Sequence, residues 1–119
     1  MLIYEVNLEV DEDINYKVAG WLSGHIEKML TLKGFKVANW FFRKPEDENS
    51  KVTNKILWTI QYVVEDRPSL DNYLKEHAEQ IRKEVNDQFG EKIQANRRVL
   101  YLLNILGSPD DLEASSSGT

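Results

Sequence analysis

The stretch "WLSGHI" at residues 21–26 recurs half a chain later as "YLKEHA" at residues 73–78. Both fragments read aromatic, leucine, two variable residues, histidine and an apolar residue, and positions four apart lie on one face of a helix. The repeat extends to both sides: "YEVN" and "WTIQ" precede the two fragments, and "ANWF" and "ANRR" follow them. We therefore predict a duplicated unit of strand, helix and strand.

Four strands and two helices follow from the pattern of apolar residues. Alternation, or a concentration of β-branched and aromatic residues, predicts strands at residues 2–10, 35–42, 55–64 and 93–106. Helical spacing predicts one helix from the acidic run at residues 11–16 to Gly34, and a second from Asp66 or Ser69 to Gly90. The polar run "RKPEDENSK" between the second and third strands is typical of a hairpin tip.

The order strand, helix, strand, strand, helix, strand is that of the ferredoxin-like fold. We expect an α+β domain over residues 1–106, with a four-stranded antiparallel sheet and both helices on one face. The duplicated halves would then be related by a pseudo-two-fold axis. Residues 107–119 are small, polar and acidic, and we expect them to form a disordered tail.

The sheet face away from the helices is expected to be too apolar to stay in water. Such a face is normally polar, yet "ILWTIQYVV" and "VLYLLNIL" are apolar at nearly every position. Whichever set of alternate residues meets the helices, the other face of the sheet still carries large apolar side chains, such as Ile3, Leu57 and Val63. Burying one large apolar side chain is worth about 1.5–3 kcal/mol. We therefore predict a homodimer with its sheets face to face, a dimeric α+β barrel.

Composition excludes several classes of protein. The 119 residues are 41% hydrophobic and carry a net charge of −5, so we expect no nucleic-acid partner and no anionic membrane partner. The absence of cysteine excludes disulfides and thiolate chemistry. The first ten residues lack the basic region of a signal peptide, and no apolar run approaches the roughly 20 residues of a membrane span. A cytoplasmic location is the expectation that follows.

The combination of "IYEVNLEV", "W…HI…ML…GF", "QY…L…YL…HA…R" and "A-x-RRVL" resembles a bacterial domain family of unknown function whose members open with I-Y-E-V-N. The similarity covers about residues 2–103. That family looks like a branch of the dimeric α+β barrel superfamily, which includes cofactor-free monooxygenases, haem-degrading oxygenases, small isomerases and amino-acid-sensing domains. The resemblance implies the fold and the dimer, and it brings no established catalytic residues.

Polar side chains are expected to converge on the sheet face away from the helices. If the alternate residues of the first strand pack on the helices, Glu5 and Asn7 point away from them, and Thr59 and Gln61 join from the duplicated strand. In the ferredoxin-like order the first strand lies between the third and the fourth. One of the adjacent arginines, Arg97 or Arg98, would then complete the cluster, with Arg98 as the ligand-binding candidate.

Two interpretations of this cluster stay open. In the first, Glu5 is a candidate catalytic carboxylate of raised pKa that moves a proton, and Asn7, Thr59, Gln61 and Arg98 bind a ligand. In the second, Glu5 pairs with an arginine in a closed structural network, and the amides satisfy each other across the dimer.

No cofactor and no metal site are expected. His25 and His77 occupy matching places in the repeat and could face each other, but no third ligand accompanies them, and each lies within an apolar stripe. Of the three positions that the haem-degrading enzymes of the superfamily use, only Asn7 fits. Val64 and Lys83 stand near the other two.

The sequence thus leaves two functions open and does not decide whether the protein is an enzyme. The first is a homodimeric small-molecule-binding barrel for an apolar or aromatic ligand, in its catalytic form a cofactor-independent enzyme that works by proton transfer. The second is a non-catalytic interaction or regulatory module whose sheet face serves only dimerisation.

Overall fold

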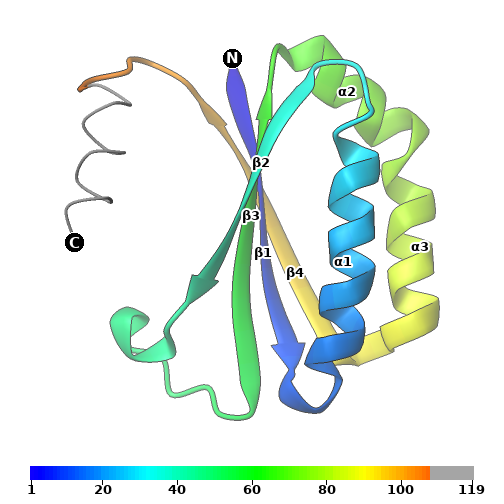
Figure 1. Ribbon diagram of the computed structural model, residues 1–119, viewed down its shortest axis with the longest axis vertical. Coiled ribbons are helices and arrows are strands. Elements are labelled where there is room, and N and C mark those ends of the chain that lie inside the picture. Colours follow the sequence, from blue (N-terminus) through cyan, green and yellow to red (C-terminus); the bar gives the residue numbers. More distant parts are fainter. Residues whose placement is uncertain (108–119) are drawn as a thin grey trace.

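The chain folds into a four-stranded antiparallel sheet with helices on one side (Figure 1). The computed structural model describes residues 1–107. The strands, in the sheet order β2-β3-β1-β4, are β1 (Leu2–Asp11), β2 (Phe35–Arg43), β3 (Lys55–Val64) and β4 (Ile93–Tyr101). The predicted α+β class and four-stranded antiparallel sheet are confirmed. The predicted disordered tail, residues 107–119, lies outside the described residues except for Gly107.

The strand β4 is shorter than the sequence predicted. It ends at Tyr101 rather than near residue 106, because its neighbour β1 begins at Leu2, which pairs with Tyr101. A single further hydrogen bond joins the backbone N–H of Leu102 to the carbonyl of Met1. Within the described residues, the apolar residues up to Leu106 have no neighbouring strand to pair with and therefore form no strand.

Three α-helices lie on the same side of the sheet instead of the predicted two (Figure 1). They are α1 (Asn15–Met29), α2 (Arg67–Glu76) and α3 (Ala78–Phe89). The second predicted helix is broken at His77, whose φ of −128° departs from helical geometry. Three short 3₁₀ turns complete the chain: η1 (Glu12–Ile14), η2 (Pro45–Glu48) and η3 (Gly90–Lys92).

The ends of α1 and α2 follow local chemistry. The carboxylate of Asp66 accepts a hydrogen bond of 3.0 Å from the backbone N–H of Ser69, so Asp66 is the N-cap of α2. After α1, Gly34 adopts a φ of +86°, which a side chain would disfavour, and the chain turns there into β2.

The hydrophobic core lies between the helices and the sheet. The sheet contributes every second residue of β1 and β3, and α1 contributes Val18, Leu22 and Met29. Aromatic rings fill one part of the core, where Tyr4 lies 5.7 Å from Tyr73 between ring centroids. On the opposite side of the sheet, none of the three α-helices lies, and of residues 1–107 the hairpin with η2 and the segment after β4 extend there (Figure 1). We call this side the open face.

Candidate functional site: a polar basin on the open sheet face

The residues that the sequence singled out lie together at the centre of the open face. Glu5 on β1 stands opposite Gln61 on β3 and Arg98 on β4. Two residues further along β1, Asn7 stands opposite Thr59 on β3. The strand register therefore brings all five predicted residues into one cluster, on the side of the sheet away from the helices.

Glu5 is the centre of this cluster and is only 3% exposed. One carboxylate oxygen, Oε1, accepts a hydrogen bond of 2.9 Å from the side-chain amide of Gln61. The other, Oε2, accepts one of 3.0 Å from the amide of Asn7 and a short one from Nε of Arg98. Both oxygens of a buried carboxylate are thus satisfied within one chain.

A second set of bonds continues from Asn7. The hydroxyl of Thr59 donates to the side-chain oxygen of Asn7 at 2.5 Å. The amide of Asn7 also lies 3.3 Å from the side-chain oxygen of Asn96, the residue opposite it on β4. This network fixes the orientation of the Asn7 amide, because its oxygen accepts from Thr59 while its nitrogen donates to Glu5.

The electrostatics of Glu5 correct one expectation from the sequence. Hydrogen bonding to Arg98 lowers the pKa of the Glu5 carboxyl from 4.5 to about 2; burial opposes this, and the amides of Gln61 and Asn7 add to it. The predicted raised pKa is therefore wrong. Glu5 is ionised at neutral pH, which makes it a weak base, and its lone pairs already accept hydrogen bonds.

Four members of the cluster, Glu5, Asn7, Thr59 and Arg98, line the floor of a basin of about 660 Å³, and Arg43 and Glu48 of the hairpin extend it. Arg43, at the end of β2, donates to both carboxylate oxygens of Glu48 in η2, at 2.9 and 3.0 Å. Its Nη2 also lies 3.4 Å from the carbonyl of Leu8. From the sequence, the run that contains Arg43 and Glu48 was predicted only as a hairpin tip, without a part in the site. The alternation that places Asn39 and Arg43 on one face of β2 is the signal that could have found Arg43.

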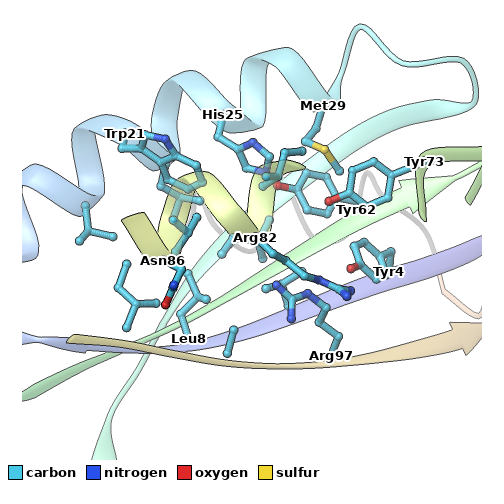
Figure 2. Close-up of a pocket in the computed structure, with 18 of the residues that line it drawn as sticks. Tyr4, Leu8, Trp21, His25, Met29, Tyr62, Tyr73, Arg82, Asn86 and Arg97 are labelled. Carbon is cyan, nitrogen blue, oxygen red and sulfur yellow. The ribbon is translucent and has the colours of Figure 1, made fainter. Parts of the chain in front are cut away.

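The two adjacent arginines point to opposite sides of the sheet. Arg98 faces the basin, and Arg97 lines a separate cavity between the helices and the sheet. Figure 2 shows this second cavity, with Arg82 of α3 near Arg97. Neither Arg82 nor this cavity was predicted, because the spacing within α3 gives no indication that an arginine of its polar side turns toward the sheet.

The two histidines of the repeat line a groove between α1 and the α2–α3 break. His25 is half-buried and stacks on Trp21 with ring centroids 4.8 Å apart, and burial lowers its pKa to about 4. His77 is exposed at the helix break, so its expected place within an apolar stripe is wrong. Within residues 1–107, no three histidine, aspartate or glutamate residues are grouped to hold a metal ion. Nor is any helix of this range long and apolar enough to cross a membrane.

Comparison with known proteins places the chain in a family and supports the fold. The family model described as a domain of unknown function, DUF4286, matches residues 1–103. The designed protein Foldit4 matches with a TM-score of 0.57 and 10% identity, over 86% of this chain and 98% of that one. The NE2512 protein of unknown function from Nitrosomonas europaea matches with a TM-score of 0.50 and 13% identity, over 90% and 95%. No curated protein matches the sequence.

Proposed function

This chain belongs to the DUF4286 family, and we propose that it acts as a homodimeric small-molecule-binding protein. Two ferredoxin-like subunits would place their open faces together as a dimeric α+β barrel, and the basin between them would hold the ligand. One observation carries the proposal: the open face combines a preassembled polar basin with apolar side chains that are exposed in a single chain.

The apolar part of the open face favours assembly. Val37, Phe41 and Leu100 share the face of Glu5 by strand register, and each is at least one-third exposed. Covering these side chains in two copies would contribute on the order of 5 kcal/mol. An exposed apolar surface of this kind marks an interaction site in a water-soluble domain.

The charges of the basin favour a second copy as the partner. Glu5 and Glu48 stand beside Arg98 and Arg43, so both signs occur on the same face. A two-fold axis brings a surface against itself, and a surface of mixed sign can complement itself where a surface of one sign would repel. The basin would then become an interior space lined by Arg98, Asn96 and Gln94 from both copies.

The proposal is binding rather than proton transfer. The low pKa and the filled lone pairs of Glu5 make it a positioning residue that fixes the guanidinium of Arg98. Arg98 keeps 64% of its side chain exposed, so it can still donate to a ligand oxygen. The expected ligand combines hydrogen-bonding groups for this floor with an apolar part for the side of the basin near Phe41.

A second candidate function is assembly without a ligand. The observation in its favour is that the buried carboxylate of Glu5 is satisfied within one chain and needs no ligand. In that case the basin of the dimer would hold only water and side chains. Both candidates share the dimer and differ in what the basin binds.

Sedimentation velocity on two matched variants tests the dimer. Phe41→Glu places a charge on the open face, and Phe42→Glu places the same charge on the next residue, which faces the other side of the sheet and is 64% exposed. We expect Phe41→Glu to raise the dimer dissociation constant at least about a hundredfold, since a two-fold interface contains the change twice. A monomeric wild type, or equal effects of the two variants, would refute the assembly.

A thermal-shift screen of small molecules on the dimer tests the ligand. Compounds that stabilise the wild type are measured again on Arg98→Gln and on Arg97→Gln, neighbours that point to opposite sides of the sheet. Binding in the basin is lost in Arg98→Gln and kept in Arg97→Gln. If no stabilising compound depends on Arg98, assembly alone is the function of this face.

A further inference from the structure

A second cavity lies on the other side of the sheet from the basin. It has a volume of about 210 Å³ and is bounded by α1 and α3 above and by β1 and β4 below (Figure 2). Its mouth is at β4, where the helix-facing residues Ala95 and Arg97 stay exposed because none of the helices α1 to α3 covers them. The cavity is therefore open to small solutes at one end and enclosed by the core at the other.

The enclosed part of the cavity is apolar. It is lined by residues of the helix side of β1 and β3 and of the sheet side of α1 and α3: Val6, Leu8, Val18, Leu22, Ile60 and Ile81. His25 adds no charge there at neutral pH, because burial keeps its pKa at about 4. An apolar body of modest size fits such a space better than water does.

One buried polar atom in the cavity has no partner. Tyr4 is 3% exposed, and its hydroxyl makes no hydrogen bond to any described residue. A buried hydroxyl without a partner costs about 1–3 kcal/mol, so native structures seldom keep one without a use for it. In Figure 2 the Tyr4 hydroxyl points into the cavity. This hydroxyl can therefore donate a hydrogen bond to a ligand, because no described residue accepts one from it.

Two guanidinium groups converge on the same place. Arg82 extends from α3 and Arg97 from β4, both line the cavity, and Figure 2 shows the two side chains beside each other, with the end of Arg82 turned toward Tyr4. No carboxylate of residues 1–107 lies within 4.0 Å of either group, although the whole chain has a net charge of −5. Burial raises the pKa of Tyr73 to about 12, and the positive charges of Arg97 and Arg82 oppose this rise. Both residues are exposed at the mouth of the cavity, and two like charges on one cavity favour an anion between them.

We propose that this cavity binds a small organic carboxylate, with its apolar body among the core side chains and its carboxylate between Arg82, Arg97 and the hydroxyl of Tyr4. The fork of an arginine matches the two oxygens of a carboxylate. A carboxylate suits the site better than a phosphate, because the singly charged group gives up less hydration on entering a mostly apolar cavity. The site is separate from the basin and does not depend on the proposed dimer.

Isothermal titration calorimetry with matched probes tests the proposal. The probes are 2-naphthoate and octanoate, each compared with its neutral amide, and 2-naphthyl phosphate. We expect at least one of the two carboxylates to bind at least about tenfold more tightly than its amide. Arg82→Gln and Arg97→Gln should each weaken that binding about tenfold or more, since each removes charge-assisted hydrogen bonds.

Matched controls separate the site from general charge effects. Lys83→Gln removes a charge from the residue next to Arg82, and Arg98→Gln removes one from the residue next to Arg97; both should leave the binding unchanged. Tyr4→Phe should weaken binding yet leave the thermal midpoint of the free protein unchanged or higher, because it removes an unsatisfied buried hydroxyl. Circular dichroism confirms that each variant is folded.

Four outcomes would overturn the inference. The first is that neither carboxylate binds at millimolar concentration, and the second is that a carboxylate and its amide bind equally. The third is that Arg98→Gln weakens binding as much as Arg97→Gln does, which would mean that the ligand binds on the open face. Tighter binding of 2-naphthyl phosphate than of 2-naphthoate would overturn the choice of a carboxylate.

Discussion

Replacing Glu5 by glutamine tests how much stability the polar network of the open face supplies. The substitution keeps the size of the side chain and removes the charge that Arg98 binds. The fall of the Glu5 pKa from 4.5 to about 2 corresponds to about 3 kcal/mol in favour of the ionised form in the folded protein. Since Arg98 is mostly exposed and can return to water, we expect Glu5→Gln to lower the free energy of unfolding by about 2–3 kcal/mol at neutral pH.

The pH dependence has a definite sign. The pKa of Glu5 is lower in the folded than in the unfolded chain, so its contribution is fully present above about pH 4.5 and is lost as the pH falls toward about 2. Wild type should therefore lose its advantage over Glu5→Gln across this acid window. Above the window, the difference between the two proteins should not change with pH.

Urea unfolding followed by circular dichroism, at one fixed protein concentration, measures both effects. Glu9→Gln is the matched control: Glu9 lies two residues beyond Asn7 on the same face of β1 and accepts no side-chain hydrogen bond from any described residue. Its free energy of unfolding should stay within about 0.5 kcal/mol of the wild-type value. Equal midpoints for wild type and Glu5→Gln, or a difference that persists in acid, would refute the account of the network.

Two further predictions concern the turn into β2 and the start of α2. Gly34→Ala should lower the free energy of unfolding by about 2–3 kcal/mol, because Gly34 has a φ of +86° and an added Cβ would collide with the side chain of Ser69. An unchanged thermal unfolding midpoint would contradict this prediction. Asp66→Ala should cost about 1 kcal/mol, because it removes the cap that accepts from the N–H and the hydroxyl of Ser69. Asp71→Ala, which removes only an exposed ion pair with Arg67, should cost no more than about 0.5 kcal/mol in the same urea titration.

Local pattern predicted the strands because a strand side chain has only two directions. Once residues such as Tyr4 face the core, the period of two forces Glu5 and Asn7 to the open face, and the pairing of β1 with β3 and β4 brings Thr59, Gln61 and Arg98 beside them. The membership of this cluster could therefore be predicted from the sequence. The repeat also placed a helix between the strands of each half.

Three features depended on contacts between distant segments. The repeat predicted one continuous helix, but α2 ends at His77. The stability of a helix in a folded protein depends mainly on how its apolar face packs, which the spacing of apolar residues along the sequence does not specify. The sign of the Glu5 pKa shift came from the hydrogen bond that Arg98 makes across the strands. Which of the two adjacent arginines reaches the basin depended on the register of β4.

Local sequence pattern was enough for the class of the fold, the residue at which each strand begins and the five polar residues around Glu5, because periodicity and turn residues act over a few neighbouring positions. That Tyr4, Arg82 and Arg97 line one cavity follows only from the packing of the folded chain. They come from β1, α3 and β4, and no local pattern connects them. Their meeting depends on how far α3 stands from the edge of the sheet, a distance that the packing of the whole core sets.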